Sequence, residues 1–355
     1  RGPLGAAGRP SLLVGLALFV VWLLMFLAPR ERRRFQPVRL LVGAYVAVWL
    51  ASVATAYLRG LTSIEGAGIE RFFLITLSLA GIALVMADHL PDRDALDRVL
   101  QALVAGAAFM GFVGFVQFQL GFDLTRFLEL PGLRSNAQGF EDGLAARGDR
   151  GFSRAVGTAA HSIEFAVLSA MVLPLAIHFA LGATDTTSRR RRWALAALVA
   201  VGIPFSLSRS GIIAAVAVLL VLLRVWNGHA KLRALAVLGV SVVLLRATVA
   251  GHVGAIGWVF ANAGSDRGVT GRTQDYELVE ALFVERPWLG LGGGTFRPEQ
   301  YFILDNYLLN ALVSTGILGL LTVIALFLGT YGLCIRMPRR LRSVEARHLA
   351  GALAA

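Results

Sequence analysis

The side chains of this chain that could carry chemistry fall into three short clusters beside long apolar runs. In the first cluster, residues 154–164, Arg154 is followed by His161 and Glu164, which are three residues apart and therefore share one face of a helix. A carboxylate one turn inside an apolar helix is costly unless it is paired or faces water. The cluster predicts either an ion pair at the start of a helix or a general base beside a substrate-binding group.

The second cluster is Ser208-Arg209-Ser210-Gly211, a very short connection between two apolar runs. Its shortness holds Arg209 near the membrane interface. One interpretation is that the guanidinium extends to lipid headgroups. The other is that Arg209 holds an anion, assisted by the flanking hydroxyls and the N-terminus of the next helix.

The third cluster runs from Arg272 through a glycine-rich stretch at 290–294 to Asp305. The glycines permit unusual backbone conformations and the close approach of a ligand. No Lys-Ser or Lys-Thr follows them, so the stretch is not a Walker loop. Asp305 precedes another apolar run, where it either caps the helix with its side chain or acts as a base.

The elements that position these clusters are membrane helices. The chain is 56% hydrophobic and only 16% charged, with a mean hydropathy of +0.68. Its apolar residues form continuous runs of about 17–25 residues, the length of a membrane-spanning helix, without the alternation of barrel strands. We predict an all-α bundle of about nine spans within a single transmembrane domain at 11–336. The predicted spans are Ser11–Pro29, Val38–Tyr57, Phe72–Ala87, Val99–Leu120, His161–Gly182, Trp193–Leu207, Ser210–Trp226, Ala234–Gly251 and Leu308–Ile335.

The distribution of positive charge predicts which side each connection faces. The net charge is +12, and the basic residues, nearly all arginines, gather in short connections between apolar runs. This is the signature of cytoplasmic loops and argues against nucleic-acid binding. Two long segments, 121–160 and 252–307, then lie on the outer side, where loops of this length are usually functional. Spans are expected to be missing at both ends of the chain.

Arginines and potential bases therefore gather at the outer membrane surface. Arginine forks suit phosphate oxygens and stay charged at any relevant pH. A substrate with a diphosphate head and a lipid tail would fit such a surface. The single Cys334 excludes a disulfide framework and a cysteine-based metal site, and no acidic pair has metal-site spacing, so we expect chemistry without a metal or cofactor.

The three clusters, in this order and with this sidedness, resemble the O-antigen ligase and O-antigen polymerase superfamily of bacterial membrane glycosyltransferases. The segment from Arg154 to Phe165 is similar to the family's entry into a central span, and Ser208–Gly211 is similar to its short outer turn. The passage from Gly271 through Pro287-Trp288-Leu289-Gly290 to Asp305-Asn306-Tyr307-Leu308 is similar to its large periplasmic loop. The resemblance covers roughly residues 152–320.

The resemblance implies transfer of a glycan from an undecaprenyl-diphosphate carrier to a glycan or lipid acceptor, at the outer face of the bacterial cytoplasmic membrane. Arg209 and Arg272, with Arg154 as a third contact, would bind the diphosphate. The ligases carry a histidine where this chain has Asp305. Asp305, His161 or Glu164 would then be the base, and the substitution favours a polymerase-like or exopolysaccharide-linked member over a strict lipid A–core ligase.

Two other functions compete with this enzyme. A transporter or flippase of lipid-linked glycans would place ionisable residues near the middle of the membrane, often in repeated halves. In this chain the charges gather at one face, and no repeat is visible. A non-catalytic membrane scaffold would not need the glycine-rich, arginine-bearing outer segment.

Overall fold

The computed structural model describes residues 10–28, 35–90, 92–127, 154–226, 228, 231–232, 267–304, 306–336 and 344–355. These residues contain helices and no strand, which confirms the predicted all-α class. The elements are α2 (Pro10–Leu27), α3 (Pro37–Leu58), α4 (Ser63–His89), α5 (Arg93–Leu120), the 3₁₀ turn η1 (Leu124–Phe127), α7 (Ser162–Leu181), α8 (Thr186–Phe205), α9 (Arg209–Val225), α12 (Arg267–Glu285), α13 (Tyr307–Arg336) and α14 (Val344–Ala354).

The helices match the predicted spans closely enough to identify a multi-pass membrane protein. Five helices are long and apolar enough to cross a membrane, namely α3, α4, α5, α7 and α13. Ser11–Leu27 and Arg209–Leu223 are apolar but shorter. The predicted span Ala234–Gly251 lies outside the described residues, as do 128–153 of the first predicted long loop and 252–266 and Asp305 of the second. The number of spans and the sidedness stay predictions.

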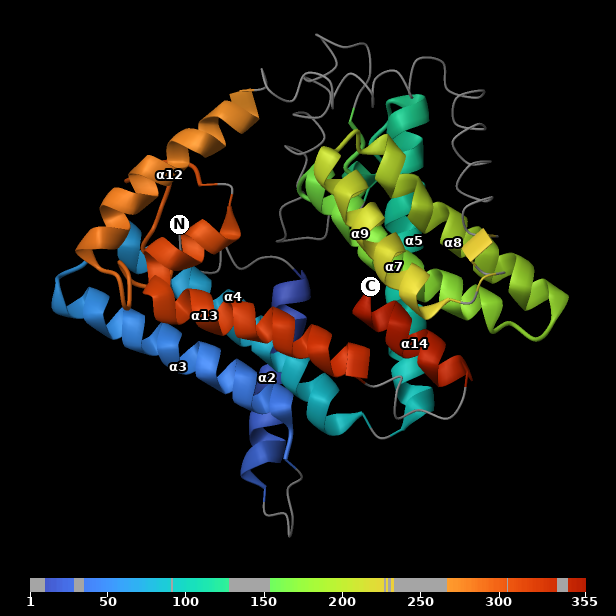
Figure 1. The fold of residues 1–355 in the computed structure, drawn as a ribbon, viewed down its shortest axis with the longest axis horizontal. Coiled ribbons are helices and arrows are strands. Elements are labelled where there is room, and N and C mark those ends of the chain that lie inside the picture. The colour runs from blue at the N-terminus through green and yellow to red at the C-terminus, as the bar shows by residue number, and fades with distance from the viewer. Residues whose placement is uncertain are drawn as a thin grey trace. The chain divides into compact units, whose positions relative to one another are not determined.

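The chain divides into two compact units (Figure 1). Unit 1 contains α2, α3, α4, α12 and α13 as far as Gly332. Glycines allow α2 and α4 to pack closely, since a Cβ added at Gly81 would lie 2.4 Å from the carbonyl oxygen of Gly15. Small residues at helix contacts are typical of membrane bundles. The Asp88 carboxylate ties α4 to its neighbours by accepting from Trp22 Nε1 at 2.9 Å and pairing with Arg39 Nε at 3.2 Å.

Unit 2 is built around α7, which packs against α5, α8, α9 and α14. Of its most apolar window, 61% is buried, more than in any other candidate span, which makes α7 the centre of this unit. Gly202 of α8 leaves room only for the Ser169 side chain, and Gly211 of α9 leaves room only for Ala166. A larger residue at either glycine would push its helix away from α7.

Helix α13 departs from the uninterrupted span that its apolar run predicts. Gly316 has φ 67° and ψ −170°, a conformation essentially restricted to glycine, and it breaks the helix into two segments. Figure 1 shows these segments meeting at an angle. At the break, the amides of Ile317 and Leu318 donate to carbonyl oxygens outside the helix.

The connection between α12 and α13 makes four backbone hydrogen bonds with the two sides of the break. The amides of Leu291 and Gly292 donate to the carbonyl oxygens of Val313 (2.9 Å) and Ser314 (2.8 Å). In the other direction, the amides of Ile317 and Leu318 donate to the carbonyl oxygens of Pro287 (2.8 Å) and Trp288 (3.4 Å). Irregular backbone at membrane depth is tolerated only when protein satisfies it, so these four bonds allow the break to exist.

The first segment of α13 runs in the same direction as α3. Tyr307 of α13 is hydrogen-bonded to Tyr45 of α3. Seven residues further along both helices, Ser52 Oγ donates to the Ser314 carbonyl oxygen at 3.0 Å. After the break the direction reverses, because Gly329 lies beside Leu41. The α13 N-terminus therefore lies beside the interior of α3 rather than beside its end.

Candidate functional site

Two of the three predicted clusters meet at one end of unit 2. The amide of Ala155 donates to the carbonyl oxygen of Phe205 at 3.1 Å, so the segment carrying Arg154 lies along the end of α8. Arg209, the first residue of α9, follows four residues after Phe205. Close packing of Gly211 against Ala166 brings the start of α9 to the first turns of α7. His161 and Glu164 belong to this same end.

The turn between α8 and α9 is built to present Arg209 at a helix N-terminus. Leu207 has φ 48°, a left-handed conformation that shortens the connection. The hydroxyl of Ser206 accepts from the amide of Ser208 at 3.2 Å, and Ser208 caps α9 by accepting from the amide of Gly211 at 3.4 Å. Arg209 is half-buried. Positive charge at a helix N-terminus would favour an anion, and binding of an anion by Arg209 stays a prediction.

Gln117 and Asp123 are site-building residues that sequence reasoning missed. Gln117 is 1% exposed. Its Oε1 accepts from the amides of Val156 (3.1 Å) and Gly157 (2.7 Å). Its Nε2 donates to the Gly157 carbonyl oxygen (2.9 Å) and to Asp123 Oδ1 (3.0 Å). This single side chain therefore fixes the backbone just after Arg154. A polar residue at the end of an apolar run, followed by Asp123 six positions later, was the available signal.

Replacing Gln117 with leucine is expected to destabilise this end of unit 2. The change leaves the Val156 and Gly157 backbone groups buried without partners, at roughly 1–3 kcal/mol for each group left unsatisfied. The thermal unfolding midpoint of the purified protein should fall. Gln101→Leu, at an exposed position of the same helix, is the matched control and should leave the midpoint nearly unchanged. Equal midpoints for the two variants would contradict this role for Gln117.

His161 and Glu164 both contact the N-terminal backbone of α7. His161 is the N-cap, and its Nδ1 accepts from the amide of Ile163 at 3.2 Å. Glu164 Oε2 accepts from the amide of Ala160 at 3.0 Å. A neutral imidazole that accepts through Nδ1 carries its proton on Nε2, so His161 must break the bond to Ile163 before it can act as a base. Glu164 carries an exposed carboxylate and needs no such change.

Arg272 and Asp305 belong to the other part of the molecule. Arg272 lies in α12, in unit 1, but its side chain is outside the described residues, as is the whole of Asp305. The helix that follows is capped by Asn306, whose Oδ1 accepts from the amides of Leu308 (3.0 Å) and Leu309 (3.3 Å). A cap is therefore present without Asp305. The convergence of Arg209 with Arg272 spans the two units and stays a prediction.

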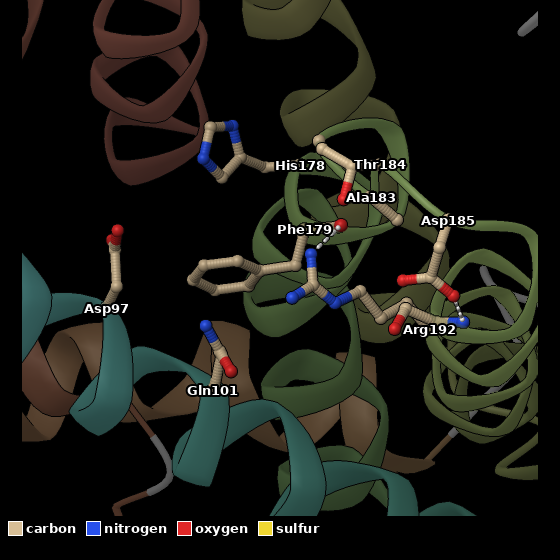
Figure 2. Close-up of a pocket in the computed structure, with 10 residues that line it drawn as sticks. Asp97, Gln101, His178, Phe179, Ala183, Thr184, Asp185 and Arg192 are labelled. Atoms are coloured by element: carbon tan, nitrogen blue, oxygen red, sulfur yellow. Dashed lines mark hydrogen bonds between the residues drawn. The ribbon is translucent and has the colours of Figure 1, made fainter.

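A polar pocket of about 310 Å³ lies at the opposite end of α7 and contains none of the predicted site residues (Figure 2). Its Arg192 donates to the Phe179 carbonyl oxygen at 3.0 Å and so caps the end of α7. Asp185 caps α8, and its hydrogen bonds from Ser188 hold the pKa of the carboxyl below its ordinary value. Arg192 and Asp185 of this pocket thus serve helix ends. Within the described residues, no group of three or more His, Cys, Asp or Glu is placed to hold a metal ion.

Comparison with known proteins agrees with the clusters. Residues 194–324 match the sequence profile of the O-antigen ligase family. The match includes Arg209, Arg272 and Asp305, while Arg154, His161 and Glu164 precede it. Curated proteins yield no match to the chain. Residues 194–324 are thus similar to the O-antigen ligase family, which confirms the predicted resemblance to the O-antigen ligase and polymerase superfamily.

Proposed function

We propose that this protein polymerises or ligates undecaprenyl-diphosphate-linked oligosaccharides at the outer face of the cytoplasmic membrane. The observation that carries the proposal is the placement of Arg209 at the N-terminus of α9, beside the Arg154 segment and within the residues that are similar to the O-antigen ligase family. The family supports the transfer of lipid-linked glycans in general. The carrier, the side of the membrane and the residue roles are parts of the proposal.

In this reaction an acceptor hydroxyl attacks the anomeric carbon of the carrier-linked sugar. A carbon–oxygen bond to the acceptor forms as the bond from the sugar to the diphosphate breaks, and the hydroxyl proton passes to a base. Arg209 and Arg272, with Arg154 as a further contact, bind the diphosphate and stabilise the charge that develops on it. Asp305 and Glu164 are the preferred candidates for the base, a role worth about 10²–10⁴ in rate, and His161 would first have to release Ile163.

Reconstitution into liposomes tests this function directly. The vesicles contain the purified protein and a radiolabelled undecaprenyl-diphosphate oligosaccharide, supplied with an acceptor glycan on the outer-face side. Glycan transfer predicts a longer, covalently joined product together with released undecaprenyl diphosphate. Movement of intact donor across the bilayer, without any new glycosidic bond, would instead establish the transporter or flippase alternative and reject the proposal.

A further inference from the structure

The turn between α3 and α4 holds a buried ion pair that the reaction scheme does not use. Arg59 ends α3, and its Nη2 pairs with Oε1 of Glu65, whose side chain is 3% exposed. Glu65 Oε2 accepts from the amide of Thr62 at 2.9 Å, and Thr62 Oγ1 accepts from the amide of Glu65 at 3.2 Å. We call Arg59, Thr62 and Glu65 the α3–α4 corner.

The α3–α4 corner binds the connection between α12 and α13, more than two hundred residues away in the chain. Arg59 Nη2 donates to the Leu291 carbonyl oxygen at 3.1 Å, and Gln300 Nε2 donates to Thr62 Oγ1 at 2.7 Å. About two turns before Arg59 on α3, Ser52 Oγ donates to the Leu289 carbonyl oxygen at 2.6 Å. The corner and Ser52 therefore hold the connection near its start, at Leu289 and Leu291, and again at Gln300.

The glycines of the connection let its backbone lie directly on α3 and α4. A Cβ added at Gly292, where φ is +116°, would lie 2.5 Å from Ala56 Cβ. At Gly294, where φ is +97°, it would lie 2.8 Å from the carbonyl oxygen of Gly68. No other residue type fits either position without displacing backbone or core side chains. The glycine cluster thus serves docking of the connection in unit 1.

This docking extends to the helix that carries Arg272. Val279 of α12 is 3% exposed and belongs to one apolar cluster with Leu291, Phe296 and Val313. Leu291 therefore shares an apolar core with α12. Asp305 lies at the other end of the same connection, only five residues beyond Gln300.

A buried ion pair seldom adds net stability over an apolar pair, but it fixes geometry, because each charge must keep its partner. Arg59 satisfies Glu65 and a loop carbonyl together, which an apolar side chain cannot do. We infer that Arg59 and Glu65 are positioning residues that set the placement of the α12–α13 connection for glycan transfer. This inference rests on the proposed function. The two residues act through the connection and touch no reacting atom.

The test compares Arg59→Met, Arg59→Lys and Glu65→Gln in the full chain, reconstituted with the labelled undecaprenyl-diphosphate donor. Two quantities are measured for each variant: amide hydrogen exchange in the peptide spanning 287–293, and kcat and KM for the donor. Glu299→Gln is the matched control, because it removes an exposed ion pair with Arg297 from the same connection.

Arg59→Met should raise exchange in this peptide at least about tenfold. It should also lower kcat by about 10²-fold, the loss that a misplacement of about 1 Å can cause, with a smaller change in KM. Arg59→Lys retains the positive charge and should recover part of kcat. The kcat of Glu65→Gln should lie between those of Arg59→Met and Arg59→Lys. Glu299→Gln should match the wild type in both exchange and kcat. Exchange in α7 and α9 should be unchanged in all variants.

Unchanged exchange in Arg59→Met would show that the corner does not hold the connection. Increased exchange with wild-type kcat would show that docking has no bearing on the reaction. Either result overturns the inference. Failure of the proposed function has a different signature, since the wild-type protein would then form no glycosidic bond under any condition. The reaction role would fall with it, and the exchange data would still decide whether the corner holds the connection.

Discussion

Arg209→Ala is expected to reduce glycan transfer by about 10²–10³-fold, the usual cost of removing one preorganised donor from developing negative charge. Arg209 is half-buried and begins α9, where the helix dipole would add to its attraction for a diphosphate. Methyl-sized alanine removes the charge and leaves the Ser208 cap in place. The measurement is the rate of product formation in liposomes containing equal amounts of inserted protein.

Arg209→Lys separates charge from geometry. Lysine keeps one positive charge but lacks the planar fork that binds two phosphate oxygens at once. The activity of Arg209→Lys should therefore lie between the activity of the wild type and that of Arg209→Ala. Arg190→Ala is the control, because Arg190 is exposed on α8 in the same unit.

Arg272→Ala should behave like Arg209→Ala if both arginines bind the same diphosphate. Full activity in both alanine variants would reject the proposed site.

The helices of unit 2 and their ends follow from local signals that the sequence displays. The apolar runs predict where α5, α7, α8 and α9 lie, and the charged clusters predict which helix ends carry chemistry. The structure shows the segment after Arg154 bonded to the end of α8, four residues before Arg209. The hydrogen bonds from Gln117 to the backbone of Val156 and Gly157 could not be predicted. A glutamine near a helix end gives no indication of which backbone segment it will bond to.

In unit 1 the sequence also indicates where α4 starts, but it does not indicate which distant segment packs against that start. Thr62 and Glu65 form a capping box, the Thr-x-x-Glu pattern that marks a helix start. It places the start of α4 at Ser63, nine residues before the predicted span Phe72–Ala87. The bond from Arg59 to Leu291 joins positions 232 residues apart, and nothing in the composition of either segment encodes that distance.

The break in α13 shows why an apolar run does not define an unbroken span. Glycine is common in membrane helices, so Gly316 alone gives no warning. The break depends on a second segment, Pro287–Gly292, that supplies matching donors and acceptors. The convergence of Arg209, Arg272 and Asp305 depends on long-range placement of the same kind and therefore remains a prediction.

Gly316→Ala is expected to disrupt this break and the connection docked on it. An added Cβ would lie 2.2 Å from both the carbonyl carbon and the oxygen of Trp288, and these are backbone atoms that cannot rotate away. The backbone conformation itself costs a non-glycine residue about 1–3 kcal/mol. Gly290 faces the break with φ +67° and is equally crowded, so the connection has no space into which it can retreat.

The expected result is a lower thermal unfolding midpoint together with faster amide exchange at Leu291 and Gly292, whose amides are bonded to the carbonyls freed by the break. Gly332→Ala is the matched control in the same helix, because a Cβ at Gly332 meets nothing within 4 Å. Alanine there should be neutral or slightly stabilising, since it is the better helix former. Because the broken helix leads directly from Asp305, transfer should fall in Gly316→Ala and persist in Gly332→Ala. If both variants keep wild-type exchange and activity, the break is not held by the connection, and the placement of Asp305 does not depend on it.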